Sequence, residues 1–228
     1  MAHSPATLVV FARAPEKGLV KTRLGERFSE DQCLAIYEAM LMDVLELASS
    51  VPGFDRRCLY WAGASEVLPS RIREASQPFH NCRQAGQDLG LRMHNAMREE
   101  FALGSGRVVV IGCDSPDLPP ERVGQALHAL ESVPLVLGPS EDGGYYLIGA
   151  SRLMREPFEG VQWGSSSVLA KTLEILGKNE IGFSLLPGWY DIDRPEDLYR
   201  LKASMRPGGA GHLRGLLSTL RVLGLAQK

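Results

Sequence analysis

The sequence predicts a single three-layer α/β/α domain with a mostly parallel central sheet. Short, nearly continuous apolar runs such as VVVIGC alternate along the chain with amphipathic helical patterns, as expected of strands that are buried on both faces. Hydrophobic residues make up 44% of the 228 positions, which is enough for one sizeable core. The turn-rich stretches 104–106 and 207–211 do not separate two segments that each hold a full set of strands and helices. We therefore expect residues 1–228 to form one domain that ends in a helical segment, 210–228.

The first half of the chain is expected to alternate strands and helices. The expected strands are 7–12, 57–62 and 78–84, and the expected helices are 29–50, 65–75 and 88–103. The first helix has the clearest signals, because Ser29 followed by Gln32 forms a capping-box pattern and apolar residues recur on one face. Asp88 is expected to open the third helix.

The second half repeats the alternation with one pair of consecutive strands. The expected strands are 107–113, 134–139, 145–150 and 181–187, and the expected helices are 119–131, 166–177, 195–203 and 212–224. Pro119 and Pro195 each open a helix, and Glu196 and Asp197 complement the dipole of the second one. The last helix has more leucines than one buried face needs, so it either packs on the domain or forms a homodimer contact.

Bulk charge excludes several classes of partner. A net charge of −2 and a pI near 6.2 give no general attraction to nucleic acid or to anionic membranes, so any anion binding must be local. No apolar run is long enough to cross a bilayer, and the N-terminus lacks the positive region of a signal peptide. The four cysteines have no paired spacing that would indicate disulfides or zinc: Cys33, Cys58, Cys82 and Cys113. We expect a cytoplasmic protein.

A cluster of cations follows the first apolar strand, in the stretch FARAPEKGLVKTRL. Arg13, Lys17, Lys21 and Arg23 surround Gly18, whose backbone can approach an oxyanion closely. Loops that leave the first strand of an open α/β sheet commonly bind a nucleotide phosphate. The stretch matches neither a Walker A sequence nor a dinucleotide-binding G-x-G-x-x-G pattern. The alternative is a solvated loop whose cations pair with acidic residues at positions 16 and 26.

Acidic residues follow a later strand and precede a late helix. Asp114 comes directly after the strand expected at 107–113, where a carboxylate can hold a divalent cation against phosphate oxygens. Asp191 and Asp193 lie two residues apart and either complete that metal site or have structural roles. Asp117 is expected to cap the helix that Pro119 opens, with a supporting role at the metal site as the alternative. Cys113 is expected to be a small buried residue.

Three weaker candidates remain. Asp142, Gly143 and Gly144 precede a strand, where they indicate either a close approach to a ligand or a tight turn. Arg92 is either near the site or on the surface. The serines at 165–167 stand at a helix start, where they can bind phosphate or cap the helix.

The stretches ARAPEKGLVKTRL, GCDSPDLP, EDGGYYLIG, WGSSSV and DIDRPEDL, in that order, resemble a prokaryotic family of nucleotide-diphospho-sugar transferase-like proteins with the glycosyltransferase-A type fold. This family is distantly similar to molybdenum cofactor guanylyltransferase and phospholactate guanylyltransferase. The resemblance implies a nucleotide over the first loop and Mg²⁺ or Mn²⁺ held by Asp114, with Asp191 or Asp193 as a second ligand. The nucleotide-binding residues that we expect are Ala12, Arg13, Ala14, Lys17, Gly18, Lys21, Arg23, Asp88, Arg92, Asp142, Gly143 and Gly144.

The activity expected from these features is metal-dependent transfer of a sugar from a nucleotide sugar to a small acceptor. Asp114, Lys21 and Arg23 are the expected catalytic residues, because fixed cations and a metal stabilise the charge that develops on a pyrophosphate leaving group. The alternative is nucleotidyl transfer from a nucleoside triphosphate to a small phosphorylated substrate, which the strongly basic loop favours. A non-catalytic nucleotide sensor is a third hypothesis, and the clustered acids argue against it.

Overall fold

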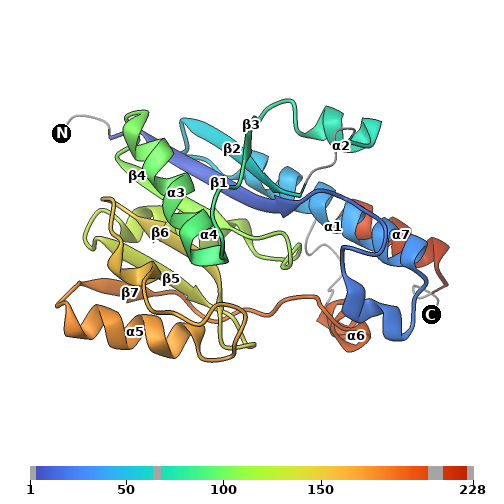
Figure 1. Ribbon diagram of the computed structural model, residues 1–228. Helices are drawn as coiled ribbons and strands as arrows, with labels where there is room; N and C mark the ends of the chain where they lie inside the picture. The colour runs from blue at the N-terminus through green and yellow to red at the C-terminus, as the bar shows by residue number, and fades with distance from the viewer. Residues whose placement is uncertain (1–3, 64–67, 205–212, 225–228) are drawn as a thin grey trace.

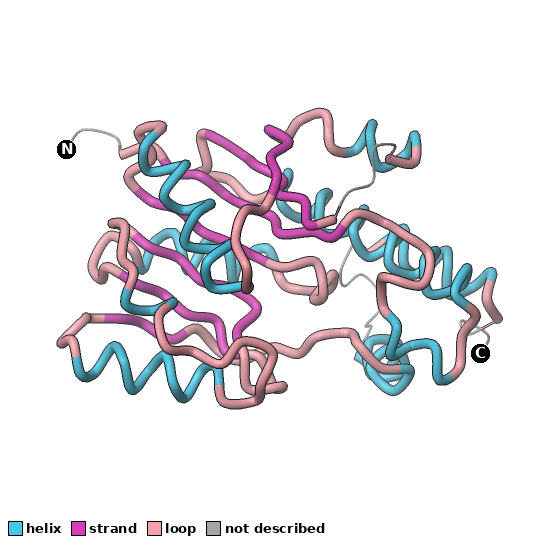
Figure 2. The backbone as a smooth tube through the Cα atoms, in the orientation of Figure 1, coloured by secondary structure: helices cyan, strands magenta, loops and turns pink. Residues whose placement is uncertain are grey.

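A computed structural model describes residues 4–63, 68–204 and 213–224. Its centre is a seven-stranded sheet with the order β3-β2-β1-β4-β6-β5-β7 (Figures 1 and 2). The strands are β1 Ala6–Arg13, β2 Arg56–Ala62, β3 His80–Arg83, β4 Arg107–Ile111, β5 Leu135–Pro139, β6 Tyr145–Ala150 and β7 Phe183–Leu185. All neighbours pair in parallel except β6, which is antiparallel to β4 and β5. The predicted α/β fold with a mostly parallel sheet is confirmed.

Helices cover both faces of the sheet, as predicted. They are α1 Glu30–Ser50, α2 Ser70–Ala75, α3 Leu89–Ala102, α4 Pro120–Ala129, α5 Val168–Lys178, α6 Pro195–Ser204 and α7 Arg214–Val222, with short 3-10 helices η1 Thr22–Glu26 and η2 Glu156–Phe158. Successive residues of β1 point to opposite faces. Leu8 and Val10 pack with residues of α1, α2 and α4, whereas Val9 and Phe11 pack with residues of α3 and α5. These contacts form the two outer layers.

The first long helix forms as its sequence indicates. The Ser29 side chain accepts a hydrogen bond from the Gln32 backbone, and the Gln32 side chain accepts one from the Ser29 backbone, so the capping box is complete. The other side of α1 packs against α6 and α7 in a separate apolar cluster. Helix α1 is therefore buried between the sheet and the C-terminal helices.

The last helix packs on the domain. Leu213, Leu216 and Leu220 are buried in the cluster with α1. Asp43 of α1 accepts hydrogen bonds from the backbone N–H groups of Gly215 and Leu216, both at 2.8 Å, which satisfies two of the free donors in the first turn of α7. Packing accounts for these leucines, and the homodimer contact stays a prediction.

Several predicted bounds shift. The strand expected at 107–113 ends at Ile111, and those expected at 78–84 and 181–187 are shorter. The helix expected from 65 begins at Ser70, and positions 65–67 lie outside the described residues, as do all of 205–211 and position 212 of the last expected helix. The helix η1 inside the basic loop has no counterpart in the prediction. No helix in the described parts of the chain is long and apolar enough to span a membrane.

Candidate active site at the carboxyl edge of the sheet

A cavity of about 520 Å³ lies beyond the carboxyl ends of β1 and β4. The chain leaves β1 toward β2 on one side, and β4 pairs with β1 on the other, so this is the topological switch point of the sheet. Ligands of open α/β sheets bind at such points, and the volume lies within the range of about 300–1,000 Å³ of small-molecule sites. The predicted site residues that line the cavity are Ala12, Arg13, Lys21, Arg23, Arg92, Asp114, Asp191 and Asp193.

Lys21 is the most enclosed cation of the site. Its Nζ donates to Asp114 Oδ1 at 2.5 Å, to Asp193 Oδ1 at 2.9 Å and to the backbone oxygen of Ile192 at 2.5 Å. Burial alone would lower the pKa of Lys21, but Asp114 and Asp193 outweigh it and raise the pKa above its usual value. Lys21 has φ 47°, a left-handed conformation uncommon outside glycine, which starts η1. This turn directs the ammonium group at the acids.

The other cations of the loop separate into two groups. Arg13 lies at the cavity, and its Nη1 donates to the oxygen of Leu19 at 3.4 Å. Arg23 Nη1 lies 3.3 Å from Asp193 Oδ2 and its side chain is 65% exposed. Lys17 instead pairs with Asp31 at 2.8 Å and does not line the cavity. The loop thus brings three of its four predicted cations to the site.

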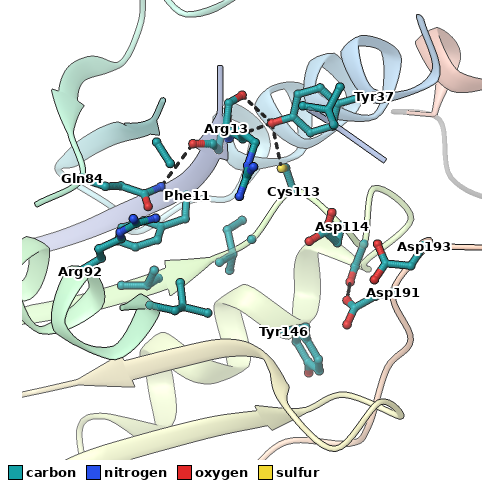
Figure 3. A pocket seen from close by; sticks show the side chains of 18 of the residues that line it. Phe11, Arg13, Tyr37, Gln84, Arg92, Cys113, Asp114, Tyr146, Asp191 and Asp193 are labelled. Carbon is teal, nitrogen blue, oxygen red and sulfur yellow. Dashed lines mark hydrogen bonds between the residues drawn. The ribbon is translucent and has the colours of Figure 1, made fainter. Parts of the chain in front are cut away.

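Arg92 supplies a cation from a different element. It stands in α3, where its Nε donates to the backbone oxygen of Gly86 at 3.0 Å. Figure 3 shows Arg13 and Arg92 toward one side of the cavity and the three aspartates Asp114, Asp191 and Asp193 on the other. The sequence left Arg92 either near the site or on the surface, and the structure places it in the lining of the cavity.

The three aspartates have different environments. Asp193 is held by Lys21 and Arg23, and although burial would raise its pKa, these cations keep the pKa below the usual value. Asp191 accepts hydrogen bonds from Ser115 at 2.7 Å and Ser140 at 2.5 Å. Burial raises the pKa of Asp191 to about 6, more than the serine hydrogen bonds lower it. Asp114 is half-exposed, with a side-chain exposure of 50%.

The predicted cap role of Asp117 is wrong. Pro119 is the N-cap residue of α4 and makes no side-chain capping bond. Asp117 accepts hydrogen bonds from Trp189 Nε1 at 3.2 Å and from the Tyr190 hydroxyl at 2.5 Å. Asp117 therefore fastens the loop after β4 to the segment that carries Asp191 and Asp193. Its carboxylate is bonded to the side chains of Trp189 and Tyr190, so it does not cap α4.

Tyr37 has no signal in the sequence that marks it as a site residue, yet it lines the cavity. Its hydroxyl donates to the backbone oxygen of Arg13 at 2.7 Å and accepts from the backbone N–H of Arg13 at 2.8 Å. The buried Cys113 thiol donates to the same hydroxyl at 3.5 Å. Tyr37 thus ties α1 to the end of β1 and to the loop after β4 (Figure 3). A tyrosine among apolar residues on one helix face is a weak signal that its hydroxyl has a buried partner.

Gln84 also has no signal in the sequence. Its Nε2 donates to the backbone oxygens of Ala12 at 3.2 Å and Tyr60 at 2.9 Å, which places the amide at the rim of the cavity (Figure 3). Phe11, at the end of β1, and Tyr146, in β6, add aromatic surface to the lining. The cavity therefore has an apolar floor and a charged rim.

Seven predicted nucleotide-binding residues do not line the cavity: Ala14, Lys17, Gly18, Asp88, Asp142, Gly143 and Gly144. Asp88 caps α3 by accepting from the Leu91 backbone at 2.8 Å, and Asp142 accepts from the Gly144 backbone at 2.9 Å. Gly143 has φ +91°, and a Cβ there would meet the backbone oxygen of Ser166 at 2.0 Å. The close approach at Gly143 is thus to a neighbouring segment of the chain.

The remaining candidates have partners within the protein. Ala14 donates its backbone N–H to Ala62 at 2.7 Å, and Gly18 has φ +76°. Ser165 and Ser167 hydrogen-bond to each other at 2.8 Å, and neither makes a side-chain cap of α5. Glu26 pairs with Arg194 rather than with a cation of the first loop.

About half of the chain matches a known protein family. Residues 49–165 match the family described as "Uncharacterized protein conserved in bacteria (DUF2064)". The chain belongs to this family. Comparison with curated proteins finds no significant match.

Solved structures share the fold over most of the chain. One is a protein from Desulfovibrio desulfuricans G20 whose proposed identity is a nucleotide-diphospho-sugar transferase, with 31% identity, a TM-score of 0.82, and coverage of 96% of this chain and 98% of that one. A CMP:2-keto-3-deoxy-manno-octonic acid synthetase complexed with CTP has 15% identity, a TM-score of 0.54 and coverages of 88% and 98%. Glucosyl-3-phosphoglycerate synthase from Mycobacterium tuberculosis, with Mn²⁺ and UDP, has 14% identity, a TM-score of 0.54 and coverages of 99% and 82%.

These neighbours confirm the predicted fold family, the nucleotide-diphospho-sugar transferase type. The expectation of an enzyme of the transferase class agrees with them, since both sugar-transferring and nucleotidyl-transferring proteins have this fold. At 15% identity or less, the last two show the fold alone.

Proposed function

We propose that the chain is a transferase that binds a nucleotide sugar in the cavity beyond β1 and β4 and passes the sugar to a small acceptor. The observation that carries the proposal is the arrangement of charge around this cavity. Arg13, Arg23 and Arg92 supply cations, and Asp114 and Asp193 supply carboxylates, at the switch point of the sheet. The likeness to the Desulfovibrio protein supports sugar transfer as the reaction.

The cations have a direct role in this chemistry. When the bond between sugar and nucleotide breaks, negative charge develops on the diphosphate leaving group. The guanidinium groups of Arg13, Arg23 and Arg92 are planar forks that bind phosphate oxygens with two donors each. Guanidinium groups that lie at the cavity before the ligand binds are placed to stabilise this charge where it develops.

A divalent cation is compatible with the donors present. Hard cations such as Mg²⁺ prefer oxygen ligands and often bind through only one or two protein carboxylates, with phosphate oxygens and waters as the rest. Asp114 is half-exposed at the cavity and fits that role, with Asp193 beside it. The described residues contain no group of three or more His, Cys, Asp or Glu side chains suited to a metal. When bound, the cation would neutralise charge on the diphosphate.

Nucleotidyl transfer is the alternative that the sequence leaves open, and the neighbours include proteins of that kind. The number of cations in the first loop favours this alternative, since a triphosphate carries more negative charge. In the protein without ligand, Lys17 pairs with Asp31 away from the cavity and Lys21 is held by acids, so the loop presents two arginines to an entering ligand rather than four cations. Sugar transfer is therefore the first choice.

The test begins with a thermal-shift screen of nucleotides and nucleotide sugars, with and without Mn²⁺. A ligand present at about 100 times its dissociation constant stabilises the folded state by about 2.7 kcal/mol, which gives a clear shift. Product analysis with the best donor then distinguishes the reactions. Free nucleoside diphosphate indicates sugar transfer, whereas pyrophosphate released from a nucleoside triphosphate indicates nucleotidyl transfer.

Two matched variants test the site itself. Asp114→Asn should lower turnover by about 100- to 1,000-fold, since it removes a charged group at the reacting centre. Asp31→Asn, an exposed aspartate that pairs with Lys17 outside the cavity, should leave turnover unchanged. Full turnover by a correctly folded Asp114→Asn protein would refute the assignment of this cavity as the active site.

A further inference from the structure

The ammonium group of Lys21 is enclosed by three oxygens. Asp114 Oδ1, the Ile192 backbone oxygen and Asp193 Oδ1 lie 2.5, 2.5 and 2.9 Å from Nζ. The Lys21 side chain is only 3% exposed. A lysine ammonium has three donors, and each has one acceptor here. Lys21 therefore has no donor left for a phosphate unless it gives up a partner within the protein.

The same three oxygens are of the kind that hold a divalent cation. Carboxylate and carbonyl oxygens are the ligands of Mg²⁺ and related hard ions, at distances of about 2.0–2.1 Å for Mg²⁺. The ammonium nitrogen lies 2.5–2.9 Å from these oxygens, so a metal held by both carboxylates would compete with Lys21 for the same oxygens. The two cations cannot both occupy this place.

The three oxygens around Lys21 Nζ, called the cage below, are also held in place by a backbone hydrogen bond. The N–H of Ile192 donates to the backbone oxygen of Asp114 at 2.8 Å, which joins the loop after β4 to the segment before α6. Charge is balanced inside the cage, because Lys21 and Arg23 offset Asp114 and Asp193. A divalent cation approaching the free protein therefore meets two carboxylates that are already neutralised.

We propose that the Lys21 ammonium occupies, in the free protein, the place between Asp114 and Asp193 that a divalent cation would take. The free protein then binds no divalent cation there, and a metal enters only together with an anionic ligand that draws Lys21 away. The first part stands on the cage alone. The second part deepens the proposed function and rests on it, because it requires a phosphate-bearing ligand in the cavity.

The first experiment measures binding of Mn²⁺ alone by electron paramagnetic resonance, without any nucleotide. Lys21→Met keeps most of the unbranched side chain and removes the charge, so this variant should bind Mn²⁺ at least tenfold more tightly than the wild type. The double variant Lys21→Met/Asp114→Asn should lose the gained site. Lys17→Met, on the same loop but paired outside the cavity, should behave as wild type.

A second measurement uses the wild-type protein, in case Lys21→Met does not fold. A buried ammonium with three acceptors exchanges its protons slowly, so its ¹⁵Nζ signal is observable by NMR. Titration with millimolar Mg²⁺ alone should leave this signal unchanged. Loss or shift of the signal at submillimolar Mg²⁺, or wild-type Mn²⁺ binding as tight as that of a folded Lys21→Met variant, would overturn the proposal.

Pyrophosphate separates this inference from the proposed function. In equilibrium dialysis the wild type should retain Mn²⁺ when pyrophosphate is present and not when it is absent. If Lys21→Met binds Mn²⁺ as expected but pyrophosphate has no effect on the wild type, the cage assignment stands and phosphate binding in the cavity is refuted. If the wild type already retains Mn²⁺ when pyrophosphate is absent, the role of Lys21 is refuted instead.

Discussion

The Tyr37 hydroxyl offers a sharp test of how the candidate site is held together. In Tyr37→Phe the ring stays in the core and only the oxygen is removed. The hydroxyl makes two hydrogen bonds to the Arg13 backbone, at 2.7 and 2.8 Å, and accepts a weaker one from the Cys113 thiol. Burial raises the pKa of Tyr37 well above its usual value, so the hydroxyl keeps the proton that it donates.

The expected loss of unfolding free energy follows from these hydrogen bonds. A neutral hydrogen bond contributes about 0.5–1.5 kcal/mol net, so two of them give about 1–3 kcal/mol of unfolding free energy. For a domain of this size, 1 kcal/mol corresponds to about 2–4 °C, so the melting temperature should fall by about 4–8 °C for a loss of 2 kcal/mol. Urea unfolding followed by circular dichroism measures the first quantity, and differential scanning calorimetry the second.

Tyr60→Phe is the matched control. The Tyr60 hydroxyl also has two partners, Glu99 and Glu100, each at 3.0 Å, but it lies on the other face of the sheet. Both variants should lose stability, and only Tyr37→Phe should also weaken binding of pyrophosphate, because Arg13 loses its anchor. A Tyr37→Phe protein within 0.5 kcal/mol of wild type would refute the reasoning that this hydroxyl fastens α1 to the end of β1 and to the loop after β4.

Four further predictions concern stability. Asp43→Ala should cost about 1–2 kcal/mol and expose the C-terminal helix to limited proteolysis, because its carboxylate caps the first turn of α7. Burial and neighbouring arginines lower the pKa of His94, so its contribution to stability is present above about pH 6.5 and is lost as the pH falls. The stability of wild type relative to His94→Gln should therefore decrease from pH 7.5 to 5.5 in urea titrations, and a constant difference would contradict this. Gly143→Ala should destabilise by at least about 2 kcal/mol, since φ is +91° and the new Cβ would clash with Ser166. Gly124→Ala, in helix α4 with open space around it, should instead stabilise by about 0.5–1 kcal/mol in the same assay.

Much of the architecture could be predicted because its signals are local. The Val- and Leu-rich run at the start of the chain and the Ser29–Gln32 pair specify β1 and α1 without reference to distant residues. Asp114 could be placed at the edge of the sheet because it follows an apolar strand, and strand ends in parallel sheets gather at one edge.

The pairing of the cations could not be predicted, since it depends on contacts between distant parts of the chain. Lys17 and Lys21 are equivalent in the sequence, yet one pairs with exposed Asp31 and the other is buried between two acids. The left-handed turn at Lys21 decides this, and lysine gives no local signal for such a turn. Asp117 was misjudged for the same reason, because its aromatic partners lie 72 and 73 positions away.

The contact between Lys21 and Asp193 joins residues 172 positions apart, and both lie outside the stretch 49–165 that matches the family. Two proteins can therefore match equally well over that stretch while only one of them has the full charge cage. In related chains the two ends should change together: loss of the lysine should accompany loss of an aspartate partner, since two facing carboxylates without their cation repel each other. A sorting of relatives by these two positions would divide them into chains with and without the cage.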